Sequence, residues 1–291
     1  MFALLGLLGL AIAGTAFVGL SGSDDGGDTA AALKPEADFP DDWPDLLDEL
    51  ELPPLADAAG AGDVLAGTGG DDTLNGAAGD DYINGAAGDD VLTGGSGADQ
   101  MHGEDGDDQM AGGGGDDLIQ GYLGDDALSG DGGHDTLHGG AGADLLDGGY
   151  DDDELLGGYG DDTLIGGAGR DMLQGSEGDD VIDGATGEDV AERDYLNGSE
   201  GRDHLIGNDG DVMSGGEDAD TFEIVDGLVS IMDYAPDDVL VLNYNGVAPV
   251  LSTDVTPTGL TLFADGSPVA SLFGVTEFDV SDVRLVANTA A

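Results

Sequence analysis

The chain has 291 residues, and its 64 acidic residues face only five basic ones, a formal net charge of −59. Nucleic acids and anionic membrane surfaces are excluded as partners, because both require the Lys and Arg side chains that this chain lacks. Cations are the expected partners, since they would relieve the self-repulsion of the chain. There is no cysteine, so disulfides and thiolate metal sites are excluded as well.

Residues 1–20 form an uncharged apolar segment that is long enough to cross a bilayer. They fit either a membrane anchor or a cleaved signal peptide, with the small residues Gly14 and Ala16 near a cleavage point. The positively charged start of a usual signal peptide is missing, because the first basic residue is Lys34. A buried helix is the third alternative.

Residues 21–57 are acidic, contain five prolines and are typical of a linker. Within them Trp43, Leu46, Leu47 and Leu50 have the spacing of one helix face. A short amphipathic helix that caps the following domain is therefore the alternative to a solvated linker.

From Ala58 onward the sequence repeats in blocks of nine residues, such as "GGAGADLLD" at residues 139–147, and fifteen blocks follow one another without an insertion. Every block has aspartate in sixth place and an apolar residue in eighth place, which is weakest at Ala191. Glycine occupies the first place in fourteen blocks and the fourth place in thirteen. Disorder does not require such a fixed phase, so the pattern indicates a regular fold.

Each block predicts a tight turn over its first six residues, where glycines permit positive φ and close stacking, followed by a very short strand with one inward side chain. Two blocks would make one coil, so that the sixth-place aspartates stack along two edges with a spacing of about 4.8 Å. Such columns of carboxylates repel one another unless cations lie between them. The candidate metal ligands are Asp63, Asp72, Asp81, Asp90, Asp99, Asp108, Asp117, Asp126, Asp135, Asp144, Asp153, Asp162, Asp171, Asp180, Asp189 and Asp203.

The donor chemistry of these columns favours calcium. Carboxylates and the carbonyls of glycine-rich turns are the oxygen ligands that hard divalent cations prefer. Magnesium requires a stricter octahedral geometry, and zinc prefers His or Cys, which are scarce or absent here. Each block buries little more than one aliphatic side chain, so we expect the repeats to be unfolded or loose without calcium.

The block resembles G-G-x-G-x-D-x-U-x, the nonapeptide of the repeats-in-toxin (RTX) family, also called hemolysin-type calcium-binding repeats. The resemblance covers residues 58–223. It implies an all-β fold, a right-handed parallel β-roll, in which sixth-place aspartates and turn carbonyls hold each ion between neighbouring turns. By this analogy roughly a dozen calcium ions bind. The family also implies secretion through a one-step, type I exporter. A metal-free β-solenoid with polar turns is the alternative.

The repeat is interrupted after Glu192 by "RDYLN" and resumes at Gly198, where we expect fewer and weaker calcium sites. Residues 224–291 alternate between apolar and polar and predict a β-rich segment that covers the open end of the roll. Asp265 and Gly266, between two apolar runs, predict a hairpin.

No catalytic motif of the metalloprotease or serine-hydrolase type is present, nor an EF-hand loop, so we do not expect an enzyme. His134 and His138 are interpreted as surface residues, with a transition-metal site as the alternative. Tyr122, Tyr150 and Tyr159 are interpreted as exposed turn residues, with carbohydrate stacking as the alternative.

The sequence thus predicts a calcium-binding repeat protein, secreted or attached to the bacterial cell surface, that folds on binding calcium outside the cell. The alternative is an adhesin-like or matrix component in which the roll is a spacer and residues 221–291 contact a ligand. Ice binding is disfavoured, because the fifth place is mostly aspartate rather than threonine. The sequence does not determine the oligomeric state.

Overall fold

The computed structural model describes residues 62–187 and 192–288. All of them belong to the unit that runs from Leu52 to Ala291. The apolar segment 1–20, the linker 21–57 and Asp189 lie outside the described residues. Within the described part of the chain, no helix is long and apolar enough to cross a membrane.

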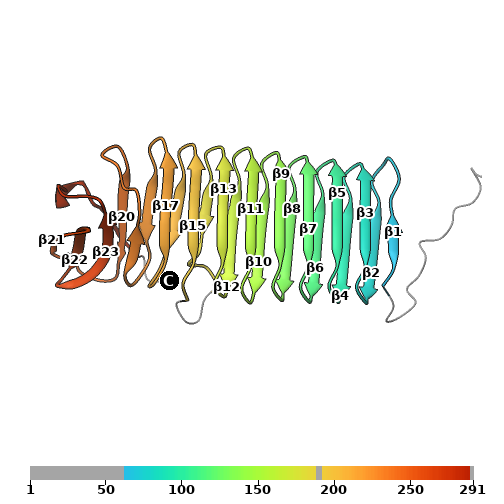
Figure 1. Cartoon of the computed structure of the whole chain (residues 1–291), viewed down its shortest axis with the longest axis horizontal. Coiled ribbons are helices and arrows are strands. Elements are labelled where there is room, and N and C mark those ends of the chain that lie inside the picture. The colour runs from blue at the N-terminus through green and yellow to red at the C-terminus, as the bar shows by residue number, and fades with distance from the viewer. Residues whose placement is uncertain (1–61, 188–191, 289–291) are drawn as a thin grey trace, which may run out of the picture. The chain divides into compact units, whose positions relative to one another are not determined.

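From β1 to β20, consecutive strands alternate between two sheets, and the coils that they form stack in chain order (Figure 1). Sheet 1 consists of β1 (Val64–Ala66), β3 (Tyr82–Ala87), β5 (Gln100–Asp105), β7 (Leu118–Leu123), β9 (Thr136–Ala141), β11 (Glu154–Tyr159), β13 (Met172–Glu177), β15 (Tyr195–Glu200), β17 (Val212–Glu217), β19 (Val229–Ile231), β23 (Ser267–Phe273), β22 (Gly259–Ala264) and β21 (Leu251–Thr256). Sheet 2 consists of β2 (Thr73–Ala78), β4 (Val91–Ser96), β6 (Gln109–Gly114), β8 (Ala127–Gly132), β10 (Leu145–Tyr150), β12 (Thr163–Ala168), β14 (Val181–Asp183), β16 (His204–Gly207), β18 (Thr221–Ile224), β20 (Val239–Tyr244) and β24 (Arg284–Ala287).

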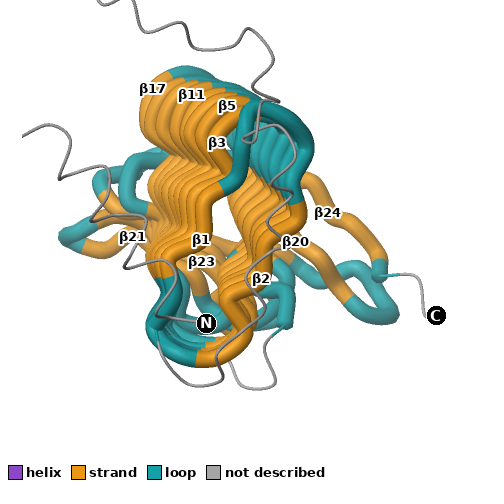
Figure 2. Tube along the Cα trace, turned by 90° about the vertical axis from the view of Figure 1, so that its right-hand side faces the viewer, coloured by secondary structure: helices purple, strands orange, loops and turns teal. Residues whose placement is uncertain are grey.

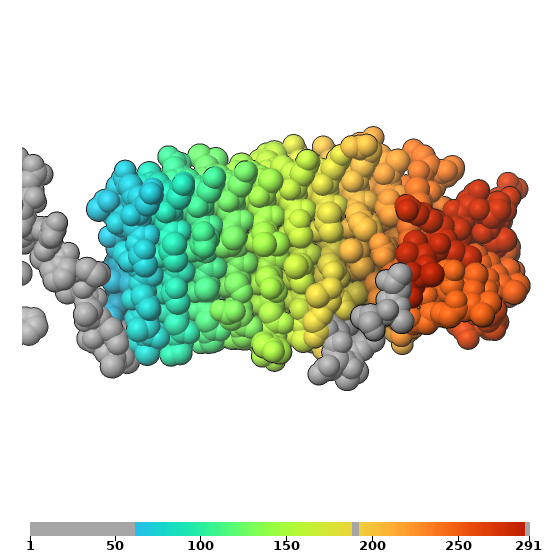
Figure 3. Space-filling view, turned by 180° about the vertical axis from the view of Figure 1, so that it is seen from behind, coloured from blue at the N-terminus to red at the C-terminus, as the bar shows by residue number. Residues whose placement is uncertain are grey.

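The pairing within the repeats is parallel and joins residues that are two blocks apart. Tyr82 lies opposite Val64, for example, and Leu164 lies opposite Leu146. Two blocks therefore make one coil, and strands of the same sheet lie behind one another along the stack (Figure 2). The space-filling view shows the coils side by side (Figure 3). The predicted all-β fold with a parallel β-roll is confirmed.

The core is a column of eighth-place side chains from each sheet. Ile83, Ile119, Leu137, Leu146 and Leu164 are all fully buried. Because side chains alternate along a strand, the neighbours in seventh and ninth place point outward. The apolar residue in each block is therefore the one that faces the opposite sheet.

The strands are longer than the sequence predicts. A regular strand has six residues, as in Thr73–Ala78, and includes the first three places of the following block. Pairing persists around the corner because turn amides also bond to the next coil, as in Gly79 N–H to Ser96 O at 2.8 Å. Stacking of identical coils thus extends a strand beyond the three residues that alternation alone indicates.

The first place of the block needs glycine because the aspartate carboxylate and the next coil lie too close for a Cβ atom, and not because the backbone there has positive φ. A Cβ on Gly121 would lie 2.2 Å from Asp126 Oδ2 and 2.6 Å from Gly139 O. Positive φ occurs instead in second and fourth place, with values of 80° at Tyr122 and 134° at Gly124. The prediction was therefore right for the fourth place, while the first place serves the close stacking.

The interruption after Glu192 leaves both sheets continuous. β14 has only three residues. Met172 pairs with Tyr195, so the number of residues between partners in successive coils rises here from 18 to 23. β15 then pairs with β17 in the ordinary parallel manner. The predicted insertion at residues 193–197 is therefore part of the roll, because Tyr195, Leu196 and Asn197 begin β15 and pair with β13.

Residues beyond 223 continue both sheets. β20 and β24 extend sheet 2, β23 pairs with β19, and an antiparallel β21–β22–β23 meander ends sheet 1. The predicted hairpin is confirmed, because Asp265 and Gly266 link β22 to β23 with φ of 51° and 84°. Leu262 and Leu272 are buried at this end and join the core of the roll.

Candidate metal centre

Each sixth-place aspartate of the described residues directly precedes a strand, and from Asp81 onward its side chain is buried in the roll. Asp108, Asp126 and Asp162 are 1–2 % exposed. The reason is the period of the strand, since the sixth and eighth places are two residues apart and share a face. The glycine in first place follows on the same face and leaves room for the carboxylate.

One carboxylate oxygen of each sixth-place aspartate joins an aspartate ladder between coils. Oδ1 of Asp126 accepts a hydrogen bond from the backbone N–H of Asp108 at 2.8 Å. Asp126 N–H in turn donates to Asp144 Oδ1 at 2.8 Å. The bond recurs along both edges, from Asp63 N–H with Asp81 Oδ1 onward, so each carboxylate is held by the coil before it.

The other oxygen, Oδ2, is buried at most of these positions without a hydrogen-bond partner. Within the described residues this holds for Oδ2 of Asp81, Asp90, Asp99, Asp108, Asp117, Asp126, Asp135, Asp144, Asp153, Asp162, Asp180 and Asp203. A buried polar atom without a partner carries a desolvation penalty of about 1–3 kcal/mol, and more when charged. Repetition of this cost in coil after coil indicates a binding role for the oxygens.

A backbone carbonyl of the next coil lies near most of these oxygens. Beside Gly121, Asp126 Oδ2 and the carbonyl oxygen of Gly139 both fall within 2.6 Å of the place that a Cβ would occupy. Beside Gly157, Asp162 Oδ2 and Gly175 O lie within 2.9 Å of the equivalent place. Most intervals between coils thus have a carboxylate oxygen and a carbonyl oxygen near the same glycine.

The electrostatics of the ladder disfavour bare carboxylates. Burial is the largest cause that raises the pKa of Asp126 to about 7 and that of Asp153 to about 8. The charges of neighbouring sixth-place aspartates, such as Asp135 and Asp171 around Asp153, raise the pKa further, while the ladder hydrogen bond lowers it. A counter-charge inside the roll would oppose both raising effects.

The fifth-place aspartates form a second ladder, which is exposed and runs in the opposite direction. Asp125 Oδ1 accepts the N–H of Ala143 in the following coil at 2.8 Å. Asp126, by contrast, accepts from the preceding coil. In this block the fifth-place carboxylate bonds to the following coil at the surface, and the sixth-place carboxylate bonds to the preceding coil. Only the sixth-place carboxylate has a buried oxygen without a partner.

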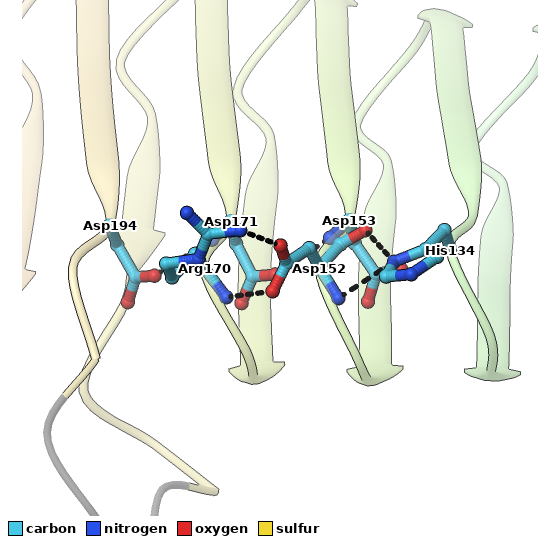
Figure 4. A network of polar contacts seen from close by, with 6 residues as sticks. All are labelled: His134, Asp152, Asp153, Arg170, Asp171 and Asp194. Carbon is cyan, nitrogen blue, oxygen red and sulfur yellow. Dashed lines mark hydrogen bonds and ion pairs between the residues drawn. The ribbon is translucent and has the colours of Figure 1, made fainter.

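Arginine occupies the fifth place in two coils and pairs with the exposed ladder. Arg170 pairs with Asp152, which also contacts His134, and the three lie beside the row of sixth-place aspartates (Figure 4). The N–H and guanidinium of Arg170 lower the pKa of Asp152. Arg202 pairs with Asp179 in the same way on the other edge.

Most of the predicted metal ligands lie in the buried ladder. Those from Asp81 to Asp180, together with Asp203, are buried in the ladder, whereas Asp63 and Asp72 in the first described coil are half-buried. Asp189 lies outside the described residues. His134 is a turn residue bonded to Asp152, whereas His138 on β9 contacts Gln120 on β7, so the two histidines belong to separate networks.

The ladder also contains aspartates that the nine-residue frame missed. Asp171 N–H donates to Asp194 Oδ1 at 2.8 Å, and Asp203 N–H donates to Asp220 Oδ1 at 3.0 Å. Asp211 and Asp238 continue the two columns. Each of these aspartates stands two residues before a buried apolar residue, so a search for Asp-x-apolar without a fixed spacing would have found them.

The donor set is built from oxygen alone. In the part of the chain that the structure describes, no group of three or more His, Asp and Glu side chains converges on one point. Further ligands in each interval would have to be backbone carbonyls. An oxygen set with few side-chain charges and flexible coordination fits calcium and does not fit zinc.

The comparison with protein families agrees with this geometry. The model of the RTX calcium-binding nonapeptide repeat matches residues 57–92, 84–119, 102–137, 129–158, 156–191 and 190–222. The chain belongs to the RTX calcium-binding repeat family. Its matches extend over more than half of the chain and coincide with the stacked coils, so the β-roll is an RTX roll. No match was found among curated proteins. RTX repeats are a structural, calcium-binding module and not a catalytic one.

Proposed function

We propose that the RTX roll of this protein binds a series of calcium ions between its coils and folds as they bind. The observation that carries the proposal is the series of buried Oδ2 atoms without hydrogen-bond partners in the described residues, which recurs on both edges of the roll between Asp81 and Asp203. Asp126 Oδ2 beside Gly139 O is representative. Calcium ions would neutralise the negative charge of these buried carboxylates.

The ions would be held by the sixth-place aspartates of the regular coils, with carbonyls of the glycine-rich turns completing the donor set. Asp194, Asp211, Asp220 and Asp238 would extend the series toward the C-terminal end. The ladder has eight intervals on one edge and nine on the other, so this series would have room for more ions than the dozen that the sequence predicts.

Coupling of calcium to folding follows from the charge. A chain with a net charge of −59 resists the compact state, and each ion that binds only the folded roll shifts the equilibrium toward it. Free calcium is scarce in the cytosol and abundant outside cells. The chain would therefore leave the cell unfolded, through a type I exporter, and fold as a secreted or surface-attached protein.

The test is a titration of the full-length chain with calcium, followed by far-ultraviolet circular dichroism, with magnesium as the control. A cooperative gain of β signal with calcium and none with magnesium is expected. A β signal already complete in the presence of chelator would contradict calcium-driven folding. Equilibrium dialysis at saturation would then count the ions against the intervals of the two ladders.

A further inference from the structure

Outside the calcium ladders, the outer face of sheet 1 has a groove at the interrupted coil. Arg170, Met172, Arg193 and Tyr195 line a hollow of about 510 Å³. Met172 on β13 pairs directly with Tyr195 on β15, and the two residues are 51 % and 49 % exposed. The groove thus has an apolar, aromatic floor that faces solvent.

A second hollow of about 260 Å³ adjoins the first and shares Met172 and Tyr195 with it. Its polar lining comes from Gln174, Asn197 and Glu154 on the neighbouring strands β13, β15 and β11. We call the two hollows together the β11–β15 groove. The amides of Gln174 and Asn197 lie at one end of it and the guanidinium groups at the other, while Glu154 is paired with Met172 between them.

The positive end is exceptional in this chain, because two of its five basic residues line one hollow. Arg170 is paired with Asp152, which offsets its charge. Arg193 donates from Nε to Gly210 O at 3.2 Å, and no carboxylate of the described residues forms an ion pair with it. That bond uses Nε only, and the guanidinium would offer its terminal N–H groups to an anion.

The chemistry of the groove identifies one class of ligand. A guanidinium binds a carboxylate in a charge-assisted, bidentate manner. An exposed tyrosine ring offers a flat apolar surface, and amides with a carboxylate bond to hydroxyl groups. We propose that the β11–β15 groove binds a carboxylated saccharide, with its carboxylate on Arg193, its ring on Tyr195 and its hydroxyls toward Asn197 and Glu154.

The net negative charge of the chain does not prevent such binding. At physiological ionic strength, charges more than about 8 Å away are largely screened. At the guanidinium end of the groove Asp152 offsets the charge of Arg170, and Glu192 also acts on Arg170, so recognition would rest on short-range, bidentate contacts of Arg193 and not on a positive field. Calcium in the ladders would reduce the repulsion further.

The test is calorimetric titration of the calcium-loaded full-length chain with tetragalacturonate, and with maltotetraose as the neutral counterpart. Three variants are compared: Arg193→Gln, Tyr195→Thr and the control Arg284→Gln. The control removes one exposed arginine from β24 in sheet 2 and changes the net charge equally. Circular dichroism in calcium verifies that each variant is folded.

We expect the uronate to bind to the wild type and to the control, with maltotetraose much weaker. Loss of one charge-assisted contact in Arg193→Gln should weaken binding by about tenfold or more, and Tyr195→Thr should weaken it by a similar factor. Equal affinity in Arg193→Gln and Arg284→Gln would overturn the proposal and assign binding to calcium bridges on the aspartate edges. Equal binding of maltotetraose, or no binding at millimolar uronate, would overturn it as well.

Discussion

At the scale of the residue, the roll depends on the contact between a first-place glycine and a sixth-place aspartate of the same coil. Gly121 and Asp126 show the contact, since a single methyl group on the glycine would meet the carboxylate oxygen. The glycine makes room for Oδ2, and Oδ1 is held by the preceding coil. The site therefore requires both residue types at this separation.

Replacement of Asp126 by Asn tests the role of the carboxylate. Asn keeps the size of the side chain but removes its charge, so calcium affinity at the adjoining intervals should fall by about tenfold or more, with lower cooperativity. The control is Asp125→Asn in the exposed ladder, which should change the calcium midpoint little. Calcium titrations followed by circular dichroism compare the two, and equal midpoints would exclude a special role for Asp126.

Replacement of Gly121 by Ala tests the room beside the carboxylate. The new Cβ would collide with Asp126 Oδ2 and Gly139 O, and overpacking of this kind destabilises by about 1–3 kcal/mol. Gly114→Ala is the control, because a Cβ there meets nothing within 4 Å. Urea denaturation in calcium should show a lower midpoint for Gly121→Ala only. A similar loss in both variants would point to a general effect of glycine removal.

At the scale of the element, alternation along six-residue strands assigns each place in the block to one face. In β10, Leu146 is fully buried, whereas its neighbour Leu145 is 46 % exposed. The same alternation turns the sixth-place aspartate inward and the fifth-place aspartate outward. Core residues and proposed metal ligands thus come from one face of each strand.

The two leucines of β10 provide a matched pair for testing this assignment. Leu146→Ala should destabilise the calcium-loaded roll by about 2–5 kcal/mol, because it leaves a cavity in the core column. Leu145→Ala removes the same atoms from the surface and should cost far less. Denaturant midpoints measured at saturating calcium compare them. Equal losses would mean that the register of β10 is wrong.

At the scale of the whole molecule, the buried aspartates link stability to protons as well as to calcium. Burial raises the pKa of Asp108 to about 6, of Asp162 to about 7 and of Asp153 to about 8, all above the ordinary value of 3.8. A raised pKa means that the folded chain binds protons more tightly than the unfolded chain. Its contribution to stability is present at low pH and is lost as pH rises through these values.

The calcium-free chain should therefore gain β structure when the pH falls from about 8 to about 5, because protons neutralise the buried carboxylates. Circular dichroism of the full-length chain in chelator measures this gain. The calcium-loaded chain at the same pH values is the control and should change less. A calcium-free chain that remains unstructured at pH 5 would show that neutralisation alone does not replace the ions.

The sequence by itself determined the period, the aspartate columns, the core residues, the terminal hairpin and the family, because each follows from a short-range rule repeated in phase. Only the tertiary structure decided the length of the strands, the inward burial of the carboxylates and the reason for the first-place glycines. Those features depend on contacts between coils, as in Gly121 with Gly139. The entry of Asp194 and Asp211 into the ladder depends on how the interruption is accommodated. The β11–β15 groove joins Arg170 and Tyr195 from different coils, and stacking alone brings them together.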